Sequence, residues 1–279
     1  MGEPILAVLF VLVAWWSSTG AILWLDRLPR RTFPWSFAAV SALALLALVG
    51  LAASRDGEGP AAAYLAFACG LAIWGWNETA FLLGYLTGPR SEPSPPGTST
   101  GRRFLHAVQA ILWHELALLA SGAAILAVTL AGSNRTGLWV FVLLWLLRTS
   151  AKLNLHLGVP NPGEGLLPDH LRHLASFFSR RAMNPLFPLS ITLATLALAR
   201  LADLAIEAPA ESLEVVMWTL LATLTALGLL EHWLMVLPVP ETALWGWVLE
   251  GRDHHRRPLA PAPLLPAGEP VGRAPGRTA

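Results

Sequence analysis

Long apolar stretches alternate with short polar segments along almost the whole chain. A helix that spans the bilayer core needs roughly 20 mostly apolar residues, and stretches of this kind recur. They lie near 4–25, 34–53, 61–86, 104–131, 137–155, 185–206 and 213–237. The pattern therefore predicts an all-α, polytopic membrane protein with about seven transmembrane helices. The fifth span is the most polar, because Arg148 and Lys152 fall within it.

One further segment, at about 168–181, has an amphipathic pattern. Leu171, Leu174, Phe177 and Phe178 fall on one helical face, and the arginines of the segment lie elsewhere. This arrangement predicts an interfacial amphipathic helix on the cytoplasmic leaflet.

The carboxyl-terminal part of the chain differs in composition from the rest. Residues 251–279 are rich in proline and poor in large apolar residues, which predicts a disordered cytoplasmic tail. Residues 1–250 then form the transmembrane domain, with Trp245 and Trp247 as anchors at the membrane interface.

Composition excludes a soluble protein. The 279 residues are 54% hydrophobic and 13% charged, whereas a soluble domain carries about 25% charged residues. The net charge is +1 and the basic residues form no cluster on a soluble domain, so we expect the lipid bilayer as a partner and no nucleic acid.

Basic residues gather in alternate loops, which sets the expected orientation. The loops after the first, third and fifth spans, the end of the fifth span and the tail together hold 16 of the 19 lysines and arginines. The opposite side has only Arg55, Arg135 and Arg200. The positive-inside rule therefore places the amino terminus in the periplasm and the carboxyl terminus in the cytoplasm. The start of the chain lacks a basic n-region, so we expect the first span to be retained.

Polar residues recur in the cytoplasmic half of the third, fourth, fifth and seventh spans. Such residues are costly in a membrane, which makes them functional candidates. This predicted intramembrane cluster consists of Asn77, Glu78, His106, His114, Glu115, Arg148, Lys152, Asn154, Glu231 and His232.

Three interpretations of the cluster remain open. In the first, the glutamates neutralise Arg148 and Lys152, and the histidines donate hydrogen bonds in a polar core. In the second, the cluster holds iron or another metal, because glutamate and histidine on facing helices are the ligands of di-iron sites. The metal-ligand candidates are Glu78, His114, Glu115 and Glu231, although the usual Glu-x-x-His spacing is missing. In the third, His106, His114 or His232 ligates the magnesium of a chlorin.

A resemblance to a known family runs from about residue 74 to 190. Residues 148–161 (RTSAKLNLHLGVPN) resemble the signature stretch of the PuhE family of photosynthetic complex assembly proteins. Further similar motifs are 76–78 (WNE), 86–90 (LTGPR), 113–115 (WHE), 167–171 (LPDHL), 176–178 (SFF) and 183–188 (MNPLFP). The motif positions that carry over are Asn77, Glu78, His114, Glu115, Lys152, Asn154 and Asn161.

The resemblance implies a role in the cytoplasmic membrane of a photosynthetic bacterium. The protein would assemble the reaction centre and core antenna, or supply bacteriochlorophyll. Its expected partners are reaction-centre or core-antenna subunits, or pigment-biosynthesis enzymes. The resemblance assigns no catalytic residue, and we expect a factor rather than an enzyme. The alternative is a membrane metalloenzyme, such as a di-iron oxygenase or hydroxylase in pigment or lipid biosynthesis.

The loop after the fifth span is a candidate docking element. Gly158 permits unusual backbone dihedrals, Pro160 stiffens the chain, and Asn161 can hydrogen-bond backbone in a tight turn. A rigid loop beside the polar cluster could bind a nascent subunit or a pigment enzyme. The other interpretation is that the loop only closes the helix bundle.

Overall fold

The computed structural model describes residues 2–238 and contains seven α-helices in that range. They are α1 (Gly2–Leu25), α2 (Phe33–Ser54), α3 (Pro60–Leu82), α4 (Thr100–Thr129), α5 (Thr136–Leu157), α6 (Leu186–Glu207) and α7 (Leu213–Leu234). Three short 3₁₀-helices occur in the loops: η1 (Arg30–Thr32), η2 (Glu164–Leu166) and η3 (Asp169–Phe177). The predicted all-α class is confirmed, while the predicted anchors Trp245 and Trp247 and the predicted tail lie outside the described residues.

Six of the described helices are long and apolar enough to cross a membrane: α1, α2, α4, α5, α6 and α7. The seventh, α3, has 23 residues but includes Asn77 and Glu78 near its end. It packs against α1, α2, α4, α5 and α7, so it lies inside the bundle and exposes little surface to lipid. A central helix can be less apolar than its neighbours, because protein rather than hydrocarbon surrounds it.

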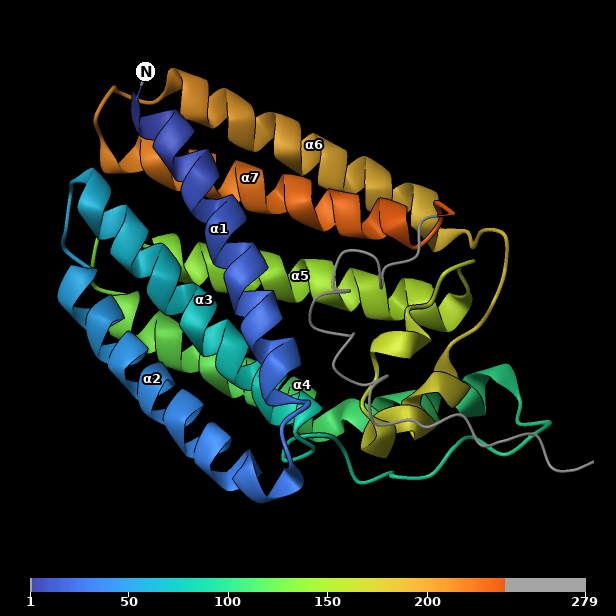
Figure 1. The fold of residues 1–279 in the computed structure, drawn as a ribbon. Coiled ribbons are helices and arrows are strands. Elements are labelled where there is room, and N and C mark those ends of the chain that lie inside the picture. The colour runs from blue at the N-terminus through green and yellow to red at the C-terminus, as the bar shows by residue number, and fades with distance from the viewer. Residues whose placement is uncertain (1, 239–279) are drawn as a thin grey trace, which may run out of the picture.

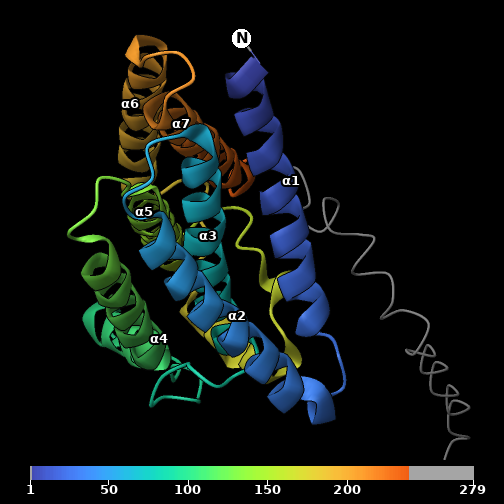
Figure 2. The same ribbon diagram turned by 90° about the vertical axis from the view of Figure 1, so that its left-hand side faces the viewer.

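The helices form a bundle in which consecutive elements run in opposite directions (Figures 1 and 2). α2 lies along α3, and α6 lies along α7. We call the end at which α1, α3, α5 and α7 finish the predicted cytoplasmic end. The amino terminus lies at the opposite end, close to the α6–α7 loop.

The backbones of α3 and α5 touch in the core of the bundle. A side chain on Gly70 would lie 2.7 Å from the carbonyl oxygen of Gly137, and one on Gly137 would lie 2.8 Å from the carbonyl oxygen of Ala66. Small residues allow membrane helices to approach this closely. The contact fixes how α3 and α5 face each other, and so it positions the charged residues further along both helices.

The loop after α3 lies directly on α4. The backbone N–H of His114 donates to the carbonyl oxygen of Thr87 at 3.0 Å. At Gly88 the loop is so close that an added Cβ would lie 2.0 Å from the carbonyl oxygen of Gln109 and 2.5 Å from the carbonyl carbon of Ala110. The motif at 86–90 therefore holds α4 in place at the level of His114.

The predicted interfacial helix is helical but not α-helical. Residues Asp169–Phe177 form a 3₁₀-helix whose buried side chains are Leu171, Leu174 and Phe177. A spacing of three residues places these side chains on one face, because a 3₁₀-helix has three residues per turn. They pack against Phe81 and Ala110 of the bundle. Phe178 lies beyond the helix, in extended backbone, so its predicted place on the same helical face is wrong.

Candidate functional site

Two ion pairs connect α5 to its neighbours near the predicted cytoplasmic end. Arg148 Nη2 lies 3.2 Å from Glu78 Oε2 on α3, and Lys152 Nζ lies 2.6 Å from Glu115 Oε1 on α4. Arg148 and Lys152 are four residues apart and so share one face of α5. Trp145, one turn before, lies on the same side and donates its indole N–H to Glu115 Oε2 at 3.4 Å. The arrangement is the charge neutralisation of the first interpretation.

Glu78 and His114 meet at the most enclosed point of the cluster. His114 has no exposed surface and Glu78 is 8% exposed. His114 Nε2 lies 3.8 Å from Glu78 Oε1, and the imidazole also contacts the ring of Phe81. Glu78 Oε1 and both ring nitrogens of His114 are buried without a hydrogen-bond partner. Within the described residues, these atoms hold the unused hydrogen-bonding capacity of the enclosed part of the cluster.

Asn77 connects α3 to α4. It is fully buried, and its amide donates to the carbonyl oxygen of Ile73 and to the hydroxyl of Ser121, each at 3.0 Å. Its bonds are complete within the bundle, and a buried amide of this kind specifies how two helices pack.

Glu231 is held from the other side of the bundle. Trp15 on α1 donates its indole N–H to Glu231 Oε1 at 3.1 Å. Arg148 interacts electrostatically with Glu231, although the two groups form no direct ion pair. Both remain accessible: Glu231 is exposed, and the Arg148 side chain is 43% exposed. The side chains of Glu231 and Arg148 are thus more accessible than those of Glu78 and His114, which are enclosed.

His232 belongs to a separate hydrogen-bond network among α5, α6 and α7. Its Nδ1 lies 2.8 Å from the carbonyl oxygen of Gly228 and its Nε2 lies 2.9 Å from Ser150 Oγ. A carbonyl oxygen only accepts, so Nδ1 carries the proton and Nε2 accepts from the serine. Ser150 Oγ lies 3.0 Å from Ser190 Oγ, which accepts from the Asn154 amide at 3.0 Å. His232 is therefore fully partnered and does not contact His114.

Three members of this network carried no role in the sequence analysis: Ser150, Ser190 and Asn184. Asn184 donates to Asn154 Oδ1 at 3.1 Å and to the carbonyl oxygen of Gly158 at 2.9 Å. Its own side-chain oxygen accepts from the backbone N–H groups of Leu186 and Phe187, at the start of α6. Asn184 lies in the motif at 183–188, which was the available signal. Serines are common in membrane helices, and nothing in their spacing identified these two.

His106 lies apart from the cluster. Its Nδ1 is 3.2 Å from Ser94 Oγ in the loop between α3 and α4. His106 precedes His114 by eight residues, or about 12 Å along a helix. The sequence analysis included His106 in the intramembrane cluster, but the hydrogen bond that it forms joins it to the α3–α4 loop and not to the buried charges.

The predicted docking loop turns its polar groups toward the protein's own helices. The backbone N–H of Asn161 donates to the carbonyl oxygen of Met235 at 3.0 Å. Its side-chain amide donates to the carbonyl oxygens of Leu234, the last residue of α7, and of Leu237 beyond it. Gly158 has a φ of 120°, which favours glycine, and an added Cβ would lie 2.7 Å from Arg181 Cγ. The carbonyl oxygen of Pro160 accepts from Arg180 at 3.4 Å. These bonds favour closure of the bundle, and docking of a partner stays a prediction.

The four candidate metal ligands do not come together. Glu115 is bonded to Lys152 and Trp145, and Glu231 to Trp15, so only Glu78 and His114 face each other. Among residues 2–238, no three histidine, cysteine, aspartate or glutamate side chains form a group that could hold a metal ion. For bacteriochlorophyll, the ring nitrogens of His114 are unpaired but buried, and both ring nitrogens of His232 are bonded, so neither histidine offers an accessible nitrogen.

Two histidines of η3, His170 and His173, should make the stability of the loop region depend on pH. His170 Nε2 donates to the carbonyl oxygen of Leu82 at 2.8 Å, which fastens η3 to the end of α3. Burial lowers the pKa of both the His170 and the His173 imidazole below the usual value of about 6.5. Below that pH the unfolded chain binds protons that the folded chain resists, so stability is lost as the pH falls from 7 to 5. We expect the thermal midpoint in detergent to fall over this range.

The matched variant for this prediction is His170→Gln, whose amide can still donate to the Leu82 carbonyl. At pH 7.5 its thermal midpoint should be similar to that of the unaltered protein. Between pH 7 and 5 its thermal midpoint should fall by less than that of the unaltered protein. An identical pH response in the two proteins would contradict the assignment of the acid sensitivity to His170.

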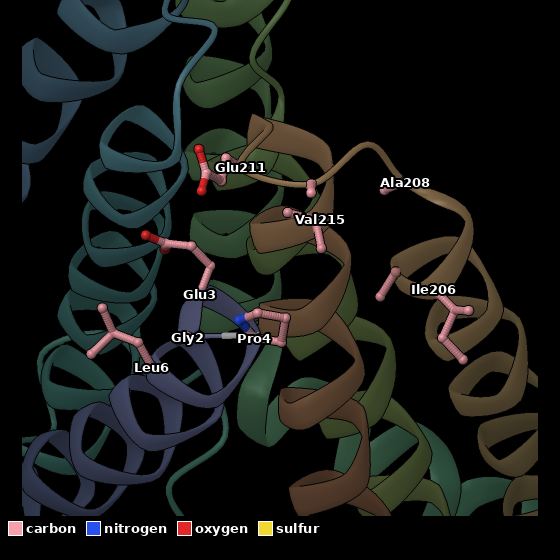
Figure 3. Close-up of a pocket in the computed structure, with 10 residues that line it drawn as sticks. Gly2, Glu3, Pro4, Leu6, Ile206, Ala208, Glu211 and Val215 are labelled. Carbon is pink, nitrogen blue, oxygen red and sulfur yellow. The ribbon is translucent and has the colours of Figure 1, made fainter.

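A cavity of about 550 Å³ lies at the opposite end of the bundle from the cluster. Figure 3 shows the start of α1 and the α6–α7 loop around it, with the side chains of Glu3 and Glu211 on the same side. Its position separates it from the ion pairs, so the polar cluster and this cavity are distinct features.

Comparisons with known proteins give a family and a relative. The family model described as "Protein of unknown function (DUF3623)" matches residues 1–256. A protein of Rhodobacter capsulatus, described as "Uncharacterized 30.4 kDa protein in puhA 5'region", is 40% identical over 277 residues, covering 96% of this chain and all of the relative. No solved structure matches.

Proposed function

The chain belongs to the DUF3623 family, and from this premise we propose that it is an assembly factor for photosynthetic complexes in a bacterial cytoplasmic membrane. It acts on the reaction centre and core antenna, either directly through their subunits or by bringing bacteriochlorophyll to them. This is the role that the similarity to the PuhE family implies, with the amino terminus in the periplasm and the carboxyl terminus in the cytoplasm.

The observation that carries the proposal is the relative from Rhodobacter capsulatus. Its name places it in the 5' region of puhA, which agrees with the similarity of this chain to the PuhE family. The similarity extends over nearly the full length of both chains, including the membrane helices and the loops between them. A related role in photosynthesis follows most simply from similarity of this extent.

The geometry of the cluster favours a factor over an enzyme. Arg148 and Lys152 are bonded to carboxylates, and Asn77, Asn154 and His232 are bonded within the bundle. Such bonds stabilise one packing of the helices and leave few groups poised for proton transfer. The enclosed side chains of the cluster thus support a scaffold with a defined shape.

A membrane metalloenzyme is the second candidate, and one observation favours it. Glu78 Oε1 and His114 Nε2 are 3.8 Å apart, and neither has a hydrogen-bond partner within residues 2–238. A glutamate and a histidine are suitable ligands for iron, but two ligands are fewer than a di-iron site uses. Stoichiometric iron in the purified protein, lost in Glu78→Gln, would support this candidate.

Deletion and complementation test the proposed function. The gene of the Rhodobacter capsulatus relative is deleted, and the strain is complemented with this chain. We expect the deletion to lower the near-infrared absorbance of the reaction centre and core antenna in membranes, and complementation to restore it. Gly101→Ala, at an uncrowded position, serves as the matched variant that should complement equally well.

The amount of bacteriochlorophyll extracted from the deletion strain distinguishes direct assembly of the complexes from supply of pigment. Direct assembly predicts that bacteriochlorophyll is still made while the complexes are reduced. Pigment supply predicts that both fall together. Normal levels of the complexes in the deletion strain would contradict the proposed function.

A further inference from the structure

Two opposite charges of the cluster stay accessible although they belong to membrane helices. The Arg148 side chain is 43% exposed and Glu231 is exposed. Ionisable groups that face hydrocarbon are costly, so accessible ones need a polar partner. Arg148 donates to Glu78 Oε2, and Glu231 accepts from the indole N–H of Trp15. A guanidinium has five N–H donors and a carboxylate two oxygens, so both groups keep hydrogen-bonding capacity.

The level of these charges in the bundle suits the polar end of a lipid. Glu231 lies three residues before the end of α7, and Arg148 lies nine residues before the end of α5. These spacings place the Cα atoms of Glu231 and Arg148 about 5 Å and about 14 Å inside the helix ends. Glu231 is therefore close to the headgroup region of the leaflet at the predicted cytoplasmic end, and the long side chain of Arg148 reaches toward it.

The charges of the two groups define the ligand. Arg148 and Glu231 are within electrostatic range of each other but do not form an ion pair. A ligand that bears an acidic group and an amine close together can satisfy both at once. An anionic ligand would meet the carboxylate of Glu231, which has no ion-pair partner among the described residues, so charge complementarity disfavours such a ligand.

We propose that Arg148 and Glu231, together with Trp15, form a binding site for the headgroup of a zwitterionic phospholipid, with the phosphate on Arg148 and the ammonium on Glu231. The Trp15 indole holds Glu231 in position from α1, and the arginine remains bonded to Glu78 from α3. The site thus unites α1, α3, α5 and α7 around one lipid molecule. The inference goes beyond the proposed assembly function and does not depend on it.

Native mass spectrometry of the full chain tests the site with three lipids that carry the same acyl chains. Phosphatidylethanolamine has a phosphate and an ammonium with N–H donors, phosphatidylcholine has no N–H donor, and phosphatidylglycerol is anionic. We expect the protein to retain them in this order, with phosphatidylethanolamine favoured over phosphatidylglycerol by about tenfold, the size of one charge-assisted hydrogen bond.

The variants are chosen so that the buried ion pair stays intact. Glu231→Gln should abolish the preference for phosphatidylethanolamine over phosphatidylcholine, and Trp15→Phe should reduce it. Arg200→Gln is the matched control, because Arg200 is an accessible arginine of α6 that pairs with Glu207; it should leave the preference unchanged. Equal retention of the three lipids, or an unchanged preference in Glu231→Gln, would overturn the proposal.

Discussion

Replacing Arg148 with methionine is expected to destabilise the protein by about 3–5 kcal/mol, because it leaves a buried carboxylate without its partner. The Glu78 side chain is only 10% exposed, so it cannot turn to water when the guanidinium is removed. The converse variant, Glu78→Leu, should cost less. It leaves Arg148, whose side chain is already 43% exposed and can reach the headgroup region.

Comparing the single variants with the double variant measures how much the ion pair between Arg148 and Glu78 contributes to stability. Arg148→Met combined with Glu78→Leu removes both charges, so it should be milder than Arg148→Met alone. The unfolding free energy in mixed micelles measures each loss.

The ion pair between Lys152 and Glu115 is the control for the expected difference in destabilisation between Arg148→Met and Glu78→Leu. Lys152 and Glu115 are 21% and 26% exposed, so their single variants should differ little from each other. Equal losses of unfolding free energy in Arg148→Met and Glu78→Leu would contradict the claim that the burial of Glu78 makes the loss of its partner more costly.

Gly88→Ala is the second substitution with a large expected effect. The new Cβ would lie 2.0 Å from the Gln109 carbonyl oxygen and 2.5 Å from the Ala110 carbonyl carbon. Both are backbone atoms, so no side-chain rotation relieves the clash, and the loop must move away from α4. The movement breaks the bond between the His114 N–H and the Thr87 carbonyl. We expect a loss of about 3 kcal/mol or more, from overpacking together with the lost hydrogen bond.

Gly101→Ala is the matched control for this substitution. Gly101 lies in the first turn of α4, and an added Cβ would have no atom within 4 Å. Alanine there should stabilise the helix by up to about 1 kcal/mol. The unfolding free energy and the amount of folded protein in membranes measure both variants. Equal stability of Gly88→Ala and Gly101→Ala would mean that the loop does not need this close contact.

The helices could be predicted because their signal is local. Each apolar run meets the length that a membrane span requires, whatever the rest of the chain does. The ends were less accurate: the third span was expected to continue to residue 86, but α3 ends at Leu82 and Gly84 adopts a φ of 86°. Apolar residues such as Leu83 continue past the end of the helix, so hydropathy does not mark where the turn begins.

The type of helix at 169–177 could not be read from the pattern. Leu171, Leu174 and Phe177 recur every three residues, and over seven residues that spacing fits both an α-helix and a 3₁₀-helix. Phe178 was assigned to the same face on the α-helical assumption. The choice depends on packing against Phe81 and Ala110, which lie far away in the sequence.

The membership of the polar cluster was predictable only in part. Depth along straight helices grouped Glu78, His114, Glu115, Arg148 and Lys152 at one level, and the structure shows contacts of Glu78 with His114 and Arg148 and of Glu115 with Lys152. Depth alone did not separate them from His106, which bonds to a loop, or from His232, which bonds to serines. Whether two groups at one level meet depends on the rotation of each helix about its own axis.

The sequence by itself determined that this chain crosses a membrane several times and that its polar side chains gather toward one end. Hydropathy and the rise per residue of a helix are local properties, so the order of residues along the chain is sufficient for both. Only the tertiary structure decided which carboxylate each cation takes and which atoms remain without partners. Those outcomes depend on contacts such as Gly70 with Gly137 and Gly88 with Gln109, where backbones meet at distances that no local pattern records.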